Sequence, residues 1–135
     1  MKLVVYADGA SRGNPGPAAI GATVQDDSGQ ELGTVSQAIG VGTNNQAEYR
    51  AAIEGVRLAR RLGATAIDLR LDSELVVRQL LGRYRVKNAA LQPLFATLVQ
   101  ELGEAGPVTI GHVPRERNRR ADALANAALD QRPPR

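Results

Sequence analysis

The chain has 135 residues, of which 43% are hydrophobic and 23% charged, so it suits one globular domain and is not a disordered chain. It has no cysteine and one histidine, which excludes disulfides, thiolate nucleophiles, and zinc sites built on cysteine or on clustered histidines. The formal net charge of +3 fits a polyanionic partner, but it fits an arginine-rich solvated surface equally well.

The first half of the chain predicts three strands followed by a long helix. The strands are expected at Lys2–Asp8, Ala18–Gln25 and Glu31–Ile39. Gly9 is expected to stop the first strand, and a turn-rich loop covers residues 11–17. A capping box formed by Thr43 and Gln46 predicts a helix at Asn44–Leu62, which Gly63 would end.

The second half predicts two more strands and three more helices. These are a strand at Ala66–Leu71, helices at Ser73–Leu81 and Leu91–Leu102, a strand at Val108–His112 and a helix at Asn118–Leu129. A basic connection covers Arg83–Ala90, with Pro93 in the first turn of the helix that follows. The order βββαβααβα predicts an α/β fold with a mixed sheet and helices packed on it.

No apolar run approaches the ~20 residues of a membrane-spanning helix, and the apolar N-terminal stretch is too short for a signal peptide. We therefore expect a cytoplasmic protein with no membrane partner. No repeat or linker interrupts the chain, so we expect one domain at residues 1–130 and a flexible tail at 131–135.

Four carboxylates are candidates for a functional site. Taken singly, Asp8 is a turn residue, Asp72 a helix N-cap, and Asp122 a charge favoured by the dipole of the last helix. Glu48 shares a helix stripe with a set of mostly small residues, Ala51, Ala52, Gly55, Ala59 and Leu62, so it should face the sheet. Buried carboxylates are rare unless paired or bound to metal, although a satisfied buried glutamate remains an alternative.

If the first and fourth strands are parallel neighbours, these four carboxylates could converge at one end of the sheet. Their mutual repulsion would then require a cation, and oxygen ligands select Mg²⁺ or Mn²⁺. A site of this kind suits two-metal phosphoryl transfer.

Six short motifs occur together in the order and with the spacing of one protein family, and they are spread over essentially the whole chain. They are Tyr6–Ser11, Gly13–Gly16, Thr43–Glu48, Leu71–Ser73, His112–Asn118 and Ala121–Ala125. With them the chain resembles type 1 ribonuclease H, in particular the compact reverse-transcriptase-like branch. The resemblance implies the ribonuclease H-like fold, a five-stranded mixed sheet with helices on both faces.

The resemblance also implies an endoribonuclease that hydrolyses the RNA strand of RNA/DNA hybrids and leaves 5′-phosphate and 3′-hydroxyl ends. Asp8, Glu48, Asp72 and Asp122 would be catalytic residues that hold two Mg²⁺ ions, with Mn²⁺ as a substitute. One ion would activate the attacking water and the other would stabilise the leaving oxygen. His112 would assist product release or proton transfer; its alternative is a strand-end residue that faces solvent.

The residues that correspond to substrate contacts are Asn14, Asn44 and Asn45 for the minor groove, and Thr43 and Asn88 for a phosphate of the DNA strand. For each asparagine near the first helix, a turn or cap role is the alternative. The basic protrusion and the tryptophans that help some relatives grip substrate are missing, so we expect weak, salt-sensitive binding by a monomer. A different nuclease of the superfamily and a non-catalytic binding module are the competing functions.

Overall fold

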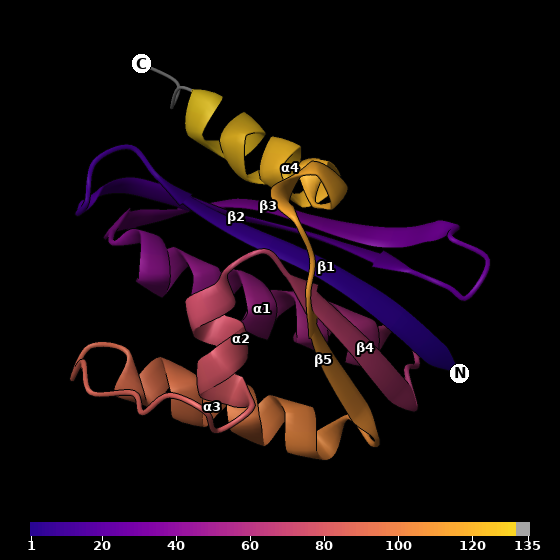
Figure 1. The fold of residues 1–135 in the computed structure, drawn as a ribbon. Coiled ribbons are helices and arrows are strands. Elements are labelled where there is room, and N and C mark those ends of the chain that lie inside the picture. The colour runs from indigo at the N-terminus through magenta and orange to yellow at the C-terminus, as the bar shows by residue number, and fades with distance from the viewer. Residues whose placement is uncertain (132–135) are drawn as a thin grey trace.

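The computed structural model describes residues 1–131 and contains one five-stranded sheet in the order β3-β2-β1-β4-β5 (Figure 1). The elements are β1 (Lys2–Ser11), β2 (Gly16–Gln25), β3 (Glu31–Gly42), α1 (Asn44–Arg61), β4 (Ala66–Leu71), α2 (Glu74–Leu80), α3 (Gln92–Glu104), β5 (Val108–His112), the 3-10 turn η1 (Arg115–Arg117) and α4 (Arg119–Asp130). The predicted order of strands and α-helices is confirmed. Except for Gln131, the predicted tail lies outside the described residues.

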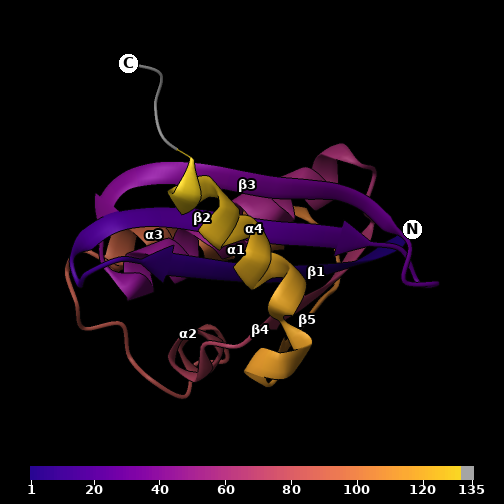
Figure 2. The ribbon, with the colours of Figure 1, turned by 90° about the horizontal axis from the view of Figure 1, so that it is seen from above.

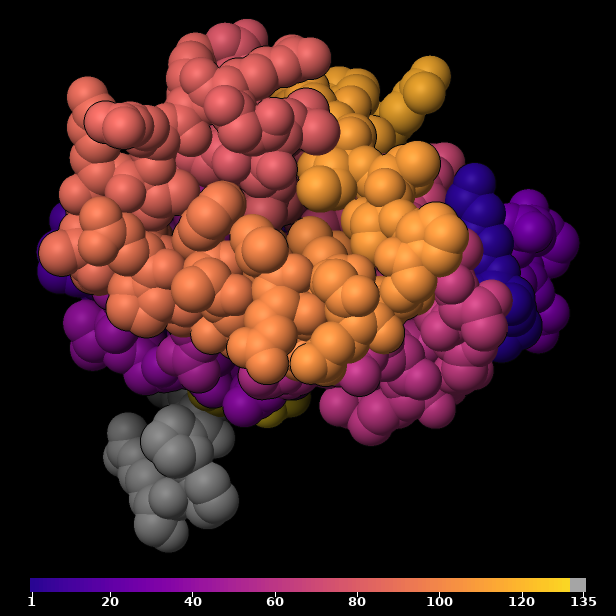
Figure 3. All heavy atoms as spheres, turned by 90° about the horizontal axis from the view of Figure 1, so that it is seen from below, coloured from indigo at the N-terminus to yellow at the C-terminus, as the bar shows by residue number. Residues whose placement is uncertain are grey.

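Helices cover both faces of the sheet, as expected. Helix α4 crosses one face over β1, β2 and β3, while α1 packs on the other face with α3 behind it (Figures 1 and 2). Seen from below, α3 and the connection before it cover α1 (Figure 3). Among the described residues, none of the helices combines the length and apolar character needed to cross a membrane.

The sheet is mixed because β1 pairs with β2 antiparallel and with β4 parallel. The first and fourth strands are therefore parallel neighbours, which was the condition for the carboxylates to meet. The parallel pairing ends at Ala7 and Leu71, so Asp8 and Asp72 each follow directly after it.

Small residues let α1 lie close to the sheet. A Cβ atom on Gly55 would lie 2.7 Å from Cγ1 of Val5 and 3.2 Å from Cβ of Ala22, so this helix–sheet contact needs glycine. The expected buried stripe is confirmed at all but its last member, Leu62, which is half-buried.

The prediction that Gly9 stops the first strand is wrong. Strand β1 continues to Ser11, because Gly9 pairs with Ile20 of β2. A Cβ on Gly9 would overlap the backbone of Ala47 and Glu48, so this glycine allows close approach of α1. Asp8 is therefore not a turn residue at a strand end but lies within β1.

Other boundaries differ because tertiary pairing extends the elements. Strands β2 and β3 continue to Gly16 and Gly42, which pair with each other across the sheet. On the side of α1 away from the sheet, Arg57 and Arg60 both contact Glu101 of α3. The face of α1 opposite the sheet is therefore partly an interface between two helices.

We predict that Gly21→Ala destabilises the fold. Gly21 pairs with Asp8, and a Cβ there would overlap the carbonyl oxygen of Ala121 and lie 2.5 Å from the backbone nitrogen of Ala125. Because both are backbone atoms of α4, the helix must move away, and the free energy of unfolding should fall by about 1–3 kcal/mol. Denaturant titration measures this change.

The matched control is Gly111→Ala in β5, where an added Cβ meets no heavy atom within 4 Å. Its stability should stay within about 0.5 kcal/mol of wild type. Equal unfolding midpoints for the two variants would show that α4 does not depend on contact with Gly21.

Candidate active site

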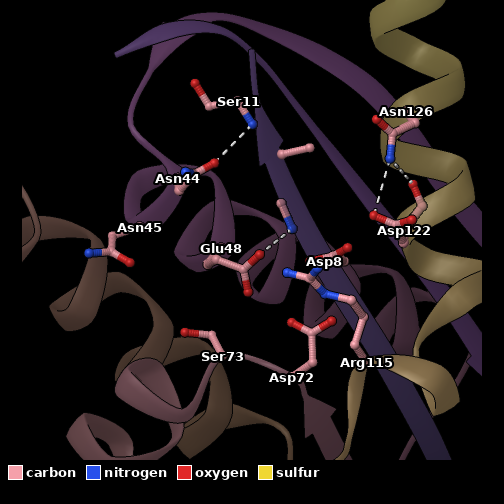
Figure 4. A pocket seen from close by; sticks show the side chains of 12 residues that line it. Asp8, Ser11, Asn44, Asn45, Glu48, Asp72, Ser73, Arg115, Asp122 and Asn126 are labelled. Atoms are coloured by element: carbon pink, nitrogen blue, oxygen red, sulfur yellow. Dashed lines mark hydrogen bonds between the residues drawn. The ribbon is translucent and has the colours of Figure 1, made fainter. Parts of the chain in front are cut away.

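The predicted carboxylates lie around one pocket at the end of the parallel strand pair (Figure 4). The pocket is lined by residues of β1, α1, α4 and the loops beside them: Asp8, Gly9, Ala10, Ser11, Asn44, Asn45, Glu48, Asp72, Ser73, Arg115, Asp122 and Asn126. It is an open, polar hollow rather than a slot for an apolar ligand.

Three of the four carboxylates form a close cluster. Asp8, Glu48 and Asp72 each offer an oxygen, and these oxygens lie within 4.8 Å of one another. Asp122 lines the same pocket from the first turn of α4 but stands outside that cluster. The sheet thus supplies two of the clustered groups and α1 supplies the third.

Three of the four carboxylates, those of Glu48, Asp72 and Asp122, accept a hydrogen bond from the backbone or from another side chain. Oε1 of Glu48 accepts a hydrogen bond from the backbone N–H of Gly9 at 2.8 Å. Oδ1 of Asp122 accepts from Nδ2 of Asn126 at 3.1 Å, one helical turn away.

Asp72 is not the N-cap of α2, which was its alternative role. Ser73 takes that place, because its hydroxyl accepts from the backbone N–H of Val76 at 3.3 Å. Asp72 is therefore free of the cap role, and its Oδ2 accepts from Nδ2 of Asn118 at 3.1 Å.

Burial and like charge make Asp8 and Glu48 hard to ionise. Burial raises the pKa of Asp8 most, and the neighbouring Glu48, Asp72 and Asp122 raise it further. Burial also raises the pKa of Glu48, although the N–H of Gly9 and the guanidinium of Arg115 act in the opposite direction. Without a cation, the cluster therefore favours retaining a proton.

The cluster fits a hard divalent cation. Oε2 of Glu48 is buried and has no hydrogen-bond partner, so it is an acceptor that lacks a donor. The neighbouring carboxylate oxygens come from three segments of the chain. Oxygen donors are the ligands that Mg²⁺ and Mn²⁺ prefer. Asp8, Glu48 and Asp72 could hold one ion directly, and Asp122 could complete the set.

The asparagines predicted from the motifs gather at the start of α1. Asn44 and Asn45 line the carboxylate pocket. Oδ1 of Asn44 accepts from the backbone N–H of Ser11 at 3.1 Å, and Oδ1 of Asn14 accepts from the N–H of Asn44 at 3.1 Å. Thr43 makes the predicted capping box with Gln46, so its side chain has a confirmed structural role.

Like Asn14 and Thr43, the predicted residues Asn88 and His112 are not among those that line the pocket. Asn88 is exposed, and its Oδ1 accepts from the backbone N–H of Ala90 at 2.8 Å. His112 is also exposed; it borders a separate hollow between α2 and β5, and its Nε2 lies 3.2 Å from the carbonyl oxygen of Asp72. It thus contacts the backbone of a clustered residue without entering the cluster.

Sequence reasoning missed Arg115, which reaches from η1 toward the carboxylates (Figure 4). Its guanidinium offsets part of the rise that burial causes in the pKa of Glu48, so it provides positive charge beside the cluster. The available signal was its position just past the end of the last strand, where loop residues face the same edge as Asp72.

Comparison with known proteins gives one family for the whole domain. The chain matches the reverse-transcriptase-like family over residues 6–128. It is 47% identical over 131 residues to a bifunctional protein of Mycobacterium tuberculosis. This match covers 96% of this chain and 36% of that protein. It is 45% identical over 129 residues to ribonuclease HI of Halobacterium salinarum, and this match covers 96% of this chain and 65% of that enzyme.

Solved structures agree with these matches. The crystal structure of the Halobacterium salinarum RNase H1 has a TM-score of 0.94 at 43% identity, and covers 96% of this chain and 98% of that one. LC11-RNase H1, crystallised with an RNA/DNA hybrid, has a TM-score of 0.90 at 41% identity, and covers 95% of this chain and 96% of that one. The chain spans about a third to two thirds of the length of the curated relatives above.

We predict that the stability of the metal-free protein falls as pH rises, and that Asp8→Asn removes much of this fall. Burial raises the pKa of Asp8 from 3.8, so the folded protein keeps a proton that the unfolded chain releases. The contribution of Asp8 to stability is then fully present at low pH and is lost above about pH 4, by up to about 1.4 kcal/mol per pH unit for one proton. Thermal melts in EDTA from about pH 5 to 8 measure the slope.

The control is Asp27→Asn, which changes an exposed aspartate in the turn before β3. It should leave the pH slope as in wild type. At neutral pH, Asp8→Asn should melt higher than wild type in EDTA, and Mg²⁺ should stabilise wild type more than the variant. A lower melting temperature for Asp8→Asn in EDTA would contradict the repulsive cluster.

Proposed function

Because the chain belongs to the reverse-transcriptase-like family of ribonuclease H domains, we propose that it hydrolyses the RNA strand of RNA/DNA hybrids. The observation that carries the proposal is the pocket in which oxygens of Asp8, Glu48 and Asp72 lie within 4.8 Å of one another, next to Asn44 and Asn45. The hybrid bound by LC11-RNase H1, a relative of nearly the same fold, supports this choice of substrate.

Asp8, Glu48, Asp72 and Asp122 would hold the divalent cations of this site, with Mg²⁺ as the physiological ion and Mn²⁺ as a substitute. Two such ions, when bound, supply an activated water on one side of the phosphodiester and stabilisation of the leaving 3′ oxygen on the other. The unpartnered Oε2 of Glu48 and the shared burial of Asp8 and Glu48 support this role, because a cation would remove the cost of ionising both.

The residues around the cluster would orient the RNA strand. Asn44 holds its carbonyl oxygen toward the N–H of Ser11, which leaves its Nδ2 available to donate to a ribose hydroxyl or a base edge. Asn45 lines the same pocket and can read the same groove. Contacts to the 2′-hydroxyl are the physical means by which a protein distinguishes RNA from DNA.

Arg115 would bind the phosphate at the point of cleavage. It is exposed, it lies beside the carboxylates, and a guanidinium matches the two oxygens of a phosphate. Cleavage on the 3′-oxygen side of the phosphate would leave 5′-phosphate and 3′-hydroxyl ends.

The DNA strand would lie along the basic connection after α2. Arg83, Arg85 and Lys87 are exposed and border hollows beside α2 and α3. Thr43 and Asn88 would contact a DNA phosphate. These few cationic contacts should give weak binding that falls as salt is raised, with a slope set by the number of phosphates that they neutralise.

The direct test uses three duplexes of one sequence: RNA/DNA, RNA/RNA and DNA/DNA, each with Mg²⁺ and with EDTA. We expect the RNA strand of the hybrid to be cut, the DNA/DNA duplex to stay intact, and EDTA to stop cleavage. End analysis should find 5′-phosphate and 3′-hydroxyl groups. Asp72→Asn should reduce cleavage to background, because it removes a charged ligand while keeping the side-chain shape.

If no duplex is cut while the hybrid is still bound, the chain is a binding module rather than an enzyme. Cleavage of branched DNA in preference to the hybrid would assign it to a different nuclease class. Either result would overturn the proposal.

A second prediction concerns His112, which we propose assists product release or proton transfer. His112→Ala should lower the turnover number by roughly 10²-fold, in line with the loss of one acid–base group, while hybrid affinity stays near wild type. Steady-state kinetics at saturating hybrid, with affinity measured separately in Ca²⁺, gives both values. An unchanged turnover number would leave His112 as a strand-end residue whose ring only contacts the backbone of Asp72.

A further inference from the structure

The buried side chain of Asn118 does not cap the helix that it precedes but contacts two other segments. It lies directly before α4, where an asparagine usually caps the helix with its own side chain. Its side chain makes no cap hydrogen bond and is only 1% exposed. Instead, its Nδ2 donates to the carbonyl oxygen of Ala7 at 3.0 Å and to Oδ2 of Asp72 at 3.1 Å.

The orientation of this amide follows from its neighbours. Both groups that Nδ2 meets are acceptors, so the reversed amide would bring three oxygens together. In the observed orientation, Oδ1 is buried and has no hydrogen-bond partner. Such an orphaned acceptor is unfavourable, so the two donor contacts, rather than general polarity, explain an asparagine at this position.

Asn118 also connects the segments that carry three of the four carboxylates. Ala7 precedes Asp8 in β1, and Asp72 follows β4. The backbone carbonyl of Asn118 accepts from the N–H of Asp122, so the first turn of α4 starts on the same residue. One side chain and its own carbonyl thus tie β1, the end of β4 and α4 together.

From these contacts we infer that Asn118 is a positioning residue that fixes the carboxylate of Asp72 relative to Asp8 and Asp122. The inference rests on the proposed function for the use of the cluster, but not for the contacts themselves. Groups that orient metal-binding carboxylates through hydrogen bonds affect metal affinity and activity about 10–100-fold. Asn118 should therefore act on cation binding and turnover, and leave binding of the nucleic acid unchanged.

The test compares Asn118→Leu, which keeps the size of the side chain and removes both donors, with Asn118→Ala, which also removes volume. The matched control is Thr23→Val, which deletes a buried hydroxyl on the same face of the sheet, where Thr23 donates to Glu31 at 2.6 Å. Mn²⁺ binding is measured by calorimetry without substrate. Turnover number and KM for the RNA/DNA hybrid are measured separately.

We expect both Asn118 variants to bind Mn²⁺ roughly 10–100-fold more weakly and to lose turnover by a similar factor, with KM within about twofold of wild type. Thr23→Val should keep wild-type Mn²⁺ affinity and turnover, even where its melting temperature falls. This difference between the Asn118 variants and Thr23→Val distinguishes a positioning role from a general loss of stability.

Several results would overturn the inference. Wild-type Mn²⁺ affinity in both Asn118 variants would mean that cation binding does not depend on the hydrogen bond from Asn118 to Asp72. An equal loss in Thr23→Val would assign the effect to stability, and failure of both Asn118 variants to fold would make Asn118 a requirement of the fold. If wild type binds Mn²⁺ but cuts no hybrid, the proposed function fails while the Mn²⁺ comparison still decides the role of Asn118.

Discussion

Asp8, Glu48 and Asp72 meet in a pocket where burial and like charge both oppose the ionisation of Asp8 and Glu48. The rest of the site follows from this constraint, because carboxylates that repel one another come together only on a rigid frame. The parallel pairing of β1 with β4 brings Asp8 and Asp72 to one edge of the sheet, and α1 supplies Glu48. A divalent cation bound there would neutralise the same repulsion, which is the basis of the proposed chemistry.

The frame depends on how closely the helices approach the sheet. Gly9 and Gly55 let α1 lie against β1, and Gly21 lets α4 lie against β2 directly across from Asp8. At each of these positions a methyl group would overlap or crowd the neighbouring element. These glycines therefore allow the close approach of α1 and α4 to the sheet, and Gly9 also donates its backbone N–H to Glu48.

Positive charge is distributed unevenly around this frame. Arg57 and Arg60 are used between α1 and α3, where they contact Glu101. Arg115 is beside the carboxylates, while the residues of the connection after α2 face outward. The number of basic residues alone therefore overstates the cationic surface available to a nucleic acid, because some arginines are paired with carboxylates.

The sequence by itself determined the element order, the capping box at Thr43, and the four carboxylates as candidates, because these depend on local periodicity and short motifs. It misjudged Gly9, whose place in β1 depends on pairing with β2, and it missed Arg115 and the side-chain role of Asn118, because these two act on Glu48 and Asp72, more than 40 residues away in the chain. Only the tertiary structure decided that Asp8 lies within a strand, that Ser73 rather than Asp72 caps α2, and that His112 stands outside the cluster. Local pattern fixes which backbone state a residue prefers, whereas the distance between two side chains is set by how whole elements pack.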